Sequence, residues 1–157
     1  MTESFRRLKQ MGSEFTYGVT ATTQIQANKM MELAIGETNR IEELLSEFKP
    51  DSDTSRINRE AYHRPVRISS ETFSLIKRCQ AISKLTDGDF DITAGAFKSL
   101  YPFRAGKNTL PAPSEIQATL AKTGFKYLEL DEQNECIRFT RPGMKINFAA
   151  IGKGYAS

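Results

Sequence analysis

The densest group of side chains able to do chemistry lies between residues 87 and 93, where aspartates occupy alternate positions: Asp87, Asp89 and Asp91. Alternating carboxylates are typical of calcium loops, but an EF-hand loop needs glycine at its sixth position and glutamate at its twelfth. Ile92 and Lys98 stand at those positions, which excludes an EF-hand. Two interpretations remain. The aspartates cap the turn that ends a helix, or the loop presents polar groups to a ligand from the apolar anchor Phe90.

A second candidate is the small-residue segment Gly152-Lys153-Gly154. A Walker A loop needs a glycine five residues before its Gly-Lys-Ser/Thr sequence. Asn147 stands at that distance and Gly154 replaces the hydroxyl residue, so the segment is not a P-loop. It is either a tight packing turn between a strand and a helix, or a helix N-terminus at which Lys153 neutralises a phosphate.

Composition excludes several other classes of function. The 157 residues contain 22 Lys+Arg and 19 Asp+Glu, a net charge of +3, and scattered basic residues that do not favour nucleic-acid binding. No apolar run approaches the roughly 18 residues of a membrane helix. The single histidine, His63, lies in a polar segment and is expected at the surface. Cys79 and Cys136 lack metal-site spacing and are interpreted as small buried residues.

Hydrophobic periodicity predicts the elements that position these segments. Polarity alternates from Phe15 to Ala21, as in a strand with one buried face. Apolar spacing changes to three and four residues over 28–48, which predicts an amphipathic helix with Asn28 as its N-cap. Residues 49–53 then form a turn, and the polar residues 52–58 are assigned no element.

The rest of the chain is predicted to alternate helices with short strands. A short edge strand at 65–68 precedes a helix that is capped at residues 69–70 and ends at Gly88. Residues 110–113 introduce a third helix, with capping-box spacing at Ser114 and Gln117 and a stop at Gly124. Residues 127–131 and 136–140 form a hairpin, followed by a strand at 145–148. This order predicts an α+β fold with an antiparallel or mixed sheet and helices packed on it.

Four segments, in this order and spacing, resemble the ApbE family of FAD:protein FMN transferases. Met11-Gly12 precedes a strand, as in the family. The turn after the first helix and the Ser-x-Ile-Asn sequence are similar, as are the family's two most specific motifs. Besides Met11-Gly12, the matched segments are Phe48-Lys49-Pro50-Asp51 together with Ser55-Arg56-Ile57-Asn58, then Thr86-Asp87-Gly88-Asp89-Phe90-Asp91-Ile92-Thr93, and finally Asn147-Phe148-Ala149-Ala150-Ile151-Gly152-Lys153-Gly154-Tyr155-Ala156.

The resemblance implies an enzyme that binds FAD and, with Mg²⁺, transfers FMN to a threonine or serine of a target flavoprotein. Phe48 stands where many members have a stacking tyrosine, and Asn147 where most have aspartate. Ala150 would offer its backbone carbonyl to the metal. The residues implied to contact the flavin nucleotide are Met11, Phe48, Asp89, Phe90, Asp91, Asn147 and Lys153.

The extent of the resemblance leads to further expectations. The match covers about the first half of a family member, so we expect residues 1–157 to be the N-terminal portion of a single ApbE-like domain whose acidic metal ligands lie in the missing C-terminal half. The alternative is a truncated, non-catalytic module that binds FAD or a related nucleotide and needs a complementing chain. Without an apolar leader at residues 1–10, the chain is expected to be cytoplasmic, or exported if a leader was removed.

Overall fold

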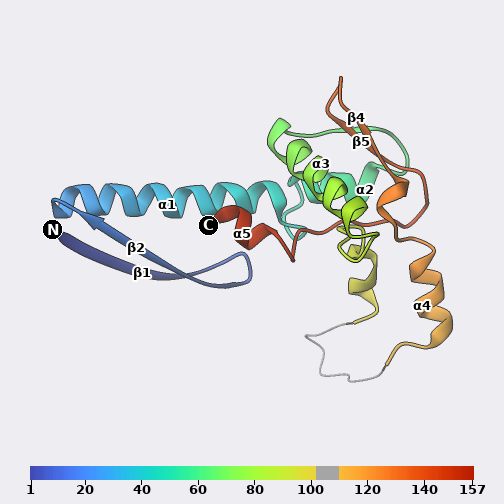
Figure 1. Cartoon of the computed structure of the whole chain (residues 1–157), viewed down its shortest axis with the longest axis horizontal. Coiled ribbons are helices and arrows are strands. Elements are labelled where there is room, and N and C mark those ends of the chain that lie inside the picture. The colour runs from blue at the N-terminus through green and yellow to red at the C-terminus, as the bar shows by residue number, and fades with distance from the viewer. Residues whose placement is uncertain (102–109) are drawn as a thin grey trace.

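The fold combines helices with two small antiparallel sheets, which confirms the predicted α+β class (Figure 1). This computed structural model describes residues 1–101 and 110–157. The helices are α1 Gln24–Leu45, α2 Asp53–Glu60, α3 Ser70–Leu85, α4 Pro113–Leu120 and α5 Gly152–Ala156, with short 3₁₀ helices η1 Gly95–Ser99 and η2 Phe125–Tyr127. The strands are β1 Thr2–Gln10, β2 Ser13–Ala21, β3 Val66–Arg67, β4 Leu128–Asp131 and β5 Cys136–Phe139. None of these described helices is long and apolar enough to cross a bilayer.

The first sheet is a hairpin of β1 and β2 that lies along α1 (Figure 1). Sequence analysis missed β1 because most of its side chains are exposed, so no alternation of polarity marks it. The helix also begins earlier than predicted. Thr23 is the N-cap, with its hydroxyl accepting a hydrogen bond from the Gln26 backbone N–H, whereas Asn28 lies inside the helix.

The hydrophobic core lies where the C-terminal end of α1 meets α2, α3 and the sheet β3-β5-β4. The predicted hairpin is confirmed as β4 and β5, and the short strand β3 pairs with β5. Helix α2 was not predicted because only one apolar residue of it is buried, Ile57, beside Asp53 and Thr54. Of the two cysteines, Cys79 is buried as expected, but Cys136 is only half-buried. His63 is exposed, as predicted.

Two predictions about the second half of the chain are wrong. The helix α4 begins after Ala112, whose backbone N–H is bound by the Glu115 carboxylate at 2.8 Å, so the cap is not Ser114 with Gln117. Residues 145–148 do not form a strand. Their alternation reflects the burial of Ile146 and Phe148 in the core, and their only ladder contact among the described residues is a bridge between Lys145 and Ala94.

Side chains and close packing hold this 145–148 segment in place of a strand ladder. The Asn58 amide donates to the Ile146 carbonyl at 2.9 Å and accepts from the Ile146 N–H at 2.7 Å. The Asn147 N–H donates to the Ile92 carbonyl at 3.0 Å. Gly95 packs directly on the same backbone, since a Cβ atom there would lie 2.8 Å from the Ile146 carbonyl carbon. These contacts fix the backbone next to Asn147.

The first prediction tests the Asn58 contacts. Asn58→Ala leaves the N–H and carbonyl of fully buried Ile146 without these partners, which should lower the free energy of unfolding by about 2–4 kcal/mol in urea denaturation. The control is Asn28→Ala on the exposed surface of α1, where Asn28 accepts from Gln24 and a change under about 0.5 kcal/mol is expected. Equal effects of the two substitutions would contradict this role for Asn58.

The second prediction tests the close approach at Gly95. Gly95→Ala should cost about 1–3 kcal/mol of unfolding free energy, because the new methyl group would meet backbone atoms that cannot rotate away. Gly36→Ala is the matched control. A methyl group at this position of α1 would meet no described atom within 4 Å, so the substitution should stabilise the protein by about 0.5–1 kcal/mol. Thermal or urea unfolding of both variants measures the difference, and a neutral Gly95→Ala would refute the packing argument.

Candidate functional site

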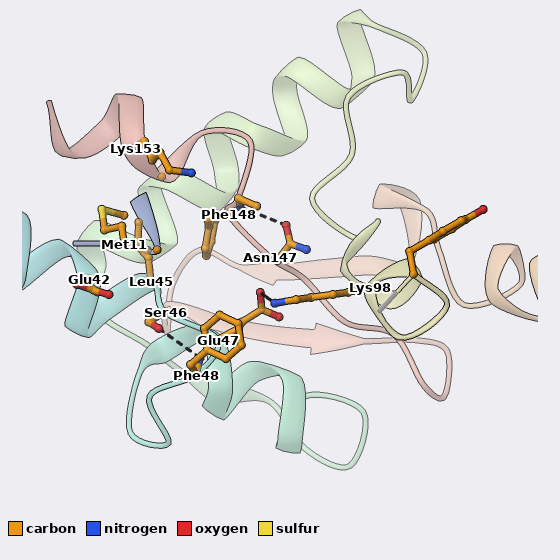
Figure 2. Close-up of a pocket in the computed structure, with 14 residues that line it drawn as sticks. Met11, Glu42, Leu45, Ser46, Glu47, Phe48, Lys98, Asn147, Phe148 and Lys153 are labelled. Atoms are coloured by element: carbon orange, nitrogen blue, oxygen red, sulfur yellow. Dashed lines mark hydrogen bonds and ion pairs between the residues drawn. The ribbon is translucent and has the colours of Figure 1, made fainter. Parts of the chain in front are cut away.

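A cavity of about 790 Å³ lies where the end of α1 meets the β1-β2 turn, η1 and the segment that leads into α5 (Figure 2). Its size falls within the range of small-molecule sites. One part of its wall is apolar and another is charged. The residues around it are Met11, Gly12, Glu42, Leu45, Ser46, Glu47, Phe48, Lys98, Tyr101, Asn147, Phe148, Ala149, Gly152 and Lys153.

The structure brings four of the sequence-predicted site residues together at this cavity: Met11, Phe48, Asn147 and Lys153. In Figure 2, Lys153 lies at one end and Phe48 at the other, with Met11, Phe148 and Asn147 between them. Ala150 is exposed and directly follows Ala149 of the cavity wall. Asp89, Phe90 and Asp91 are not among the residues of the wall.

The loop that contains those three residues lies outside the cavity wall and holds the wall in place through hydrogen bonds. The Asp91 carboxylate accepts hydrogen bonds from the Thr93 N–H at 2.8 Å, the Thr93 hydroxyl at 2.7 Å and the Phe125 N–H at 2.7 Å. Phe90 packs against the core, while Asp89 is exposed. Asp91 therefore closes the turn after α3 and joins it to η2. This turn places the Ile92 carbonyl that receives the Asn147 N–H.

The aromatic end of the cavity is built by the residues that follow α1. Thr54 donates to the Leu45 carbonyl at 2.9 Å and Ser52 donates to the Ser46 carbonyl, so the N-terminus of α2 caps the last turn of α1. Phe48 follows this turn with 72% of its surface exposed, so its ring is accessible from the cavity. Its backbone is held by a hydrogen bond to the Ser46 hydroxyl at 3.3 Å.

One face of the Phe48 ring is covered by a lysine. The Lys98 ammonium lies 4.0 Å from the ring centroid and forms an ion pair with Glu47 (Figure 2). A cation over an aromatic face is a weak attraction at an exposed site. Lys98 is thus held at the cavity by two contacts, of which the aromatic one occupies a surface on which a planar ligand could stack.

The opposite end is polar. The Asn147 side-chain oxygen accepts from the Ala149 N–H at 3.2 Å, which orients the side chain at the cavity wall. Lys153 is the second residue of the short helix α5. Its side chain forms no ion pair within residues 1–101 and 110–157, so its charge is available to a ligand.

Met11 joins the hairpin to this polar end. It adopts a left-handed conformation with φ 47°, followed by Gly12 at 75°, as a two-residue hairpin turn of type I′ requires. Gln10, 7% exposed, ties the turn to α1 through hydrogen bonds to Asn39 at 2.6 Å and to the Ile35 carbonyl at 3.4 Å. The Met11 methyl group would lie 3.3 Å from a Cβ at Gly152, which is a tight contact, so Met11 packs closely on α5.

Sequence analysis missed three charged residues of the site: Glu42, Glu47 and Lys98. Glu42 and Glu47 resemble solvated charges near the end of an amphipathic helix, and nothing in the spacing of Lys98 relates it to α1. With Lys153, the described wall contains two acidic and two basic side chains, of which Lys98 and Glu47 neutralise each other.

A metal site is not apparent in the described part of the chain. No cluster of three or more histidine, cysteine, aspartate or glutamate side chains there is arranged to hold an ion. The Ala150 carbonyl would be a single oxygen ligand, whereas Mg²⁺ is usually fixed by one or two carboxylates together with substrate phosphates. The described donors therefore do not by themselves fit Mg²⁺.

Comparison with known proteins places this chain in a family. The sequence model of the ApbE family matches residues 11–157. An FAD:protein FMN transferase of Chlamydia muridarum is 30% identical over 118 residues, which are 75% of this chain and 37% of that protein. An FAD:protein FMN transferase of Klebsiella pneumoniae is 29% identical over 145 residues, 92% of this chain and 45% of that protein.

Solved structures agree with this assignment. The crystal structure of the ApbE protein from Thermotoga maritima shares 30% identity and superposes with a TM-score of 0.87, covering 99% of this chain and 50% of that one. The flavin transferase ApbE from Vibrio cholerae, at 21% identity, shares the fold with a TM-score of 0.84 over the same fractions. This chain therefore spans half or less of the length of these proteins. The matched motifs, the fold and these relatives together show that the chain belongs to the ApbE family.

Proposed function

We propose that this chain forms the flavin-nucleotide binding part of an FAD:protein FMN transferase. The observation that supports this most directly is the union, in one cavity, of an exposed aromatic ring at Phe48 and a cation, Lys153, that has no ion-pair partner among the described residues. A flavin dinucleotide has the complementary parts, a planar ring system and a pyrophosphate. The curated relatives in Chlamydia muridarum and Klebsiella pneumoniae are named for the same substrate.

Each part of the cavity has a distinct task in this proposal. Phe48 offers a stacking surface for the flavin ring, and the buried side chains of Leu45 and Phe148 form an apolar part of the cavity wall. Lys153 neutralises phosphate oxygens. Asn147 offers an amide in place of the family's usual aspartate, so it can donate a hydrogen bond as well as accept one.

In the proposed transfer, a threonine or serine hydroxyl of a target flavoprotein attacks the FMN phosphorus of FAD, loses its proton and forms a phosphoester, while the pyrophosphate bond breaks and AMP leaves. Such transfers depend on positioning and charge neutralisation more than on covalent catalysis by the protein. The residues described above bind and orient the nucleotide and lower the charge near its phosphates. We infer that Mg²⁺, if it takes part with Ala150 as one ligand, requires carboxylates beyond this chain's described donors, as from a C-terminal half or a complementing chain.

A second candidate function is a non-catalytic module that binds FAD without transferring FMN. It is favoured by the lack of a metal-binding cluster among the described residues and by Asn147, which lacks the charge of an aspartate. In that case the cavity would bind the nucleotide but turnover would require a complementing chain. Binding and transfer must therefore be measured separately.

The third prediction concerns ligand binding. FAD fluorescence should change on addition of the protein and titrate to saturation, and Lys153→Met should weaken FAD binding about tenfold, as expected for loss of one charge-assisted contact to phosphate. Riboflavin, which has the ring without phosphates, should be insensitive to Lys153→Met. Phe48→Ala should weaken both ligands by about tenfold through loss of stacking. Flavin fluorescence measures each dissociation constant.

The same binding assay includes a control variant, and a transfer assay then distinguishes the two candidate functions. Lys29→Met removes an exposed lysine of α1 away from the cavity and should leave both affinities unchanged. Absence of saturable FAD binding by the unmodified chain would refute the proposed function. Incubation with FAD, Mg²⁺ and a threonine-containing target flavoprotein then distinguishes the two candidates, since covalent flavin on the target supports the transferase and binding without transfer supports the module.

A further inference from the structure

Helix α5, Gly152–Ala156, contains Lys153, the cation of the proposed pyrophosphate site. The contacts of this helix with the rest of the protein bear on where the Lys153 side chain lies. Figure 1 shows α5 beside α1, close to the turn of the β1-β2 hairpin.

Tyr155 makes a hydrogen bond from α5 to another helix. Its hydroxyl donates to Oε1 of Glu71, in the first turn of α3, at 3.0 Å. Residues 84 positions apart are joined by this bond. Glu71 accepts from a second donor as well, because Arg40 of α1 grips both of its oxygens, with Nη1 to Oε2 at 2.6 Å and Nη2 to Oε1 at 2.9 Å. Three helices meet at one carboxylate.

Arg40 is itself oriented within α1. Its Nε and Nη2 donate to the two oxygens of Glu37, one turn earlier, at 2.9 and 2.7 Å. The Arg40 guanidinium binds Glu37 on one edge and Glu71 on the other, so it has little rotational freedom. The Arg40–Glu71 pair is therefore stronger than an isolated ion pair at the surface. The Arg40 hydrogen bonds lower the pKa of Glu71, and burial followed by the Glu71 hydrogen bond raises the pKa of Tyr155. Both groups therefore keep the protonation states that this bond needs at neutral pH.

Helix geometry connects this cluster to the cavity. Residues two apart on an α-helix point about 200° apart around its axis, so Tyr155 and Lys153 project from nearly opposite sides of α5. With Tyr155 directed at α3 and α1, Lys153 is turned toward the cavity, where it is part of the wall. Two further contacts restrain the helix: Gly152 is buried beside Met11, and Ala156 packs against the core.

We propose that Arg40, Glu71 and Tyr155 form a clamp that fixes the rotation of α5, which makes Tyr155 a positioning residue for Lys153 at the phosphate end of the cavity. The ligand part of this inference rests on the proposed function, whereas the clamp itself rests on contacts within the chain. Tyr155 acts through Lys153 and does not touch the nucleotide. Its loss should therefore matter only for ligands that Lys153 recognises.

The fourth prediction tests this coupling. Tyr155→Phe should weaken FAD binding about fivefold and leave riboflavin binding unchanged, because the ring has no phosphate for Lys153 to neutralise. In a Lys153→Met background, Tyr155→Phe should cause no further loss of FAD affinity, since the residue through which it acts is absent. Tyr62→Phe is the matched control, on an exposed tyrosine that contacts His63 edge-on. Additive losses in the double variant would overturn the positioning role.

A measurement without ligand tests the clamp itself. Tyr155→Phe should speed amide hydrogen exchange in residues 151–157 relative to the unmodified chain, and Arg40→Lys should do the same to a smaller degree, because lysine cannot bind Glu71 on two edges. Unchanged exchange in both variants would overturn the clamp. If the unmodified chain fails to bind FAD, the proposed function fails, and exchange alone then decides whether the clamp exists. Faster exchange with unchanged FAD affinity would retain the clamp but reject its effect on Lys153.

Discussion

The candidate site depends on the pair of hydrogen bonds between the Asn58 amide and the backbone of Ile146. Among the described residues, 144–148 have no strand beside them to supply a ladder along their length, so a side chain takes that role. A primary amide imitates a peptide group, because it places N–H donors and a carbonyl acceptor in one fixed plane. The pair anchors the backbone one residue before Asn147, and every group that follows toward α5 is placed from that anchor.

Other parts of the site are positioned by similarly few backbone contacts. Ser52 and Thr54 donate hydrogen bonds to carbonyl groups at the end of α1 and so fix the direction in which the chain continues to Phe48. Gly95 allows η1 to press on the segment next to Asn147, and Gly152 allows Met11 to approach α5. The residues most characteristic of the family motifs therefore divide into two groups. Some line the cavity, and others, such as Asp91 and Asn58, hold the lining residues in place.

Sequence patterns predicted the elements whose burial is periodic and missed those whose burial is not. Helix α3 and the β4-β5 hairpin each show a regular apolar face and were predicted correctly. Strand β1 and helix α2 are mostly polar because they bury little apolar surface, and no periodicity can reveal them. Residues 145–148 alternate in polarity like a strand because they cross the core. Their backbone hydrogen bonds, however, go to Asn58 and Ile92, which are far away in sequence. For the site, motif positions indicated Met11, Phe48, Asn147 and Lys153, whereas Glu47 and Lys98 come together only through the fold.

Because Lys98 lies over the Phe48 ring, a ligand that stacks on that face replaces one contact of the ring with another. A planar ligand that uses the covered face must displace an ammonium group, so the net gain is the difference between a ring-ring and a cation-ring contact. The displaced lysine keeps its ion pair with Glu47. Added salt would then act in opposite directions at the two ends of the cavity. It would loosen the lysine from its acidic partner and ease entry of the ring, while screening the attraction between Lys153 and phosphate. Ionic strength would consequently shift the preference of the cavity between neutral rings and charged nucleotides.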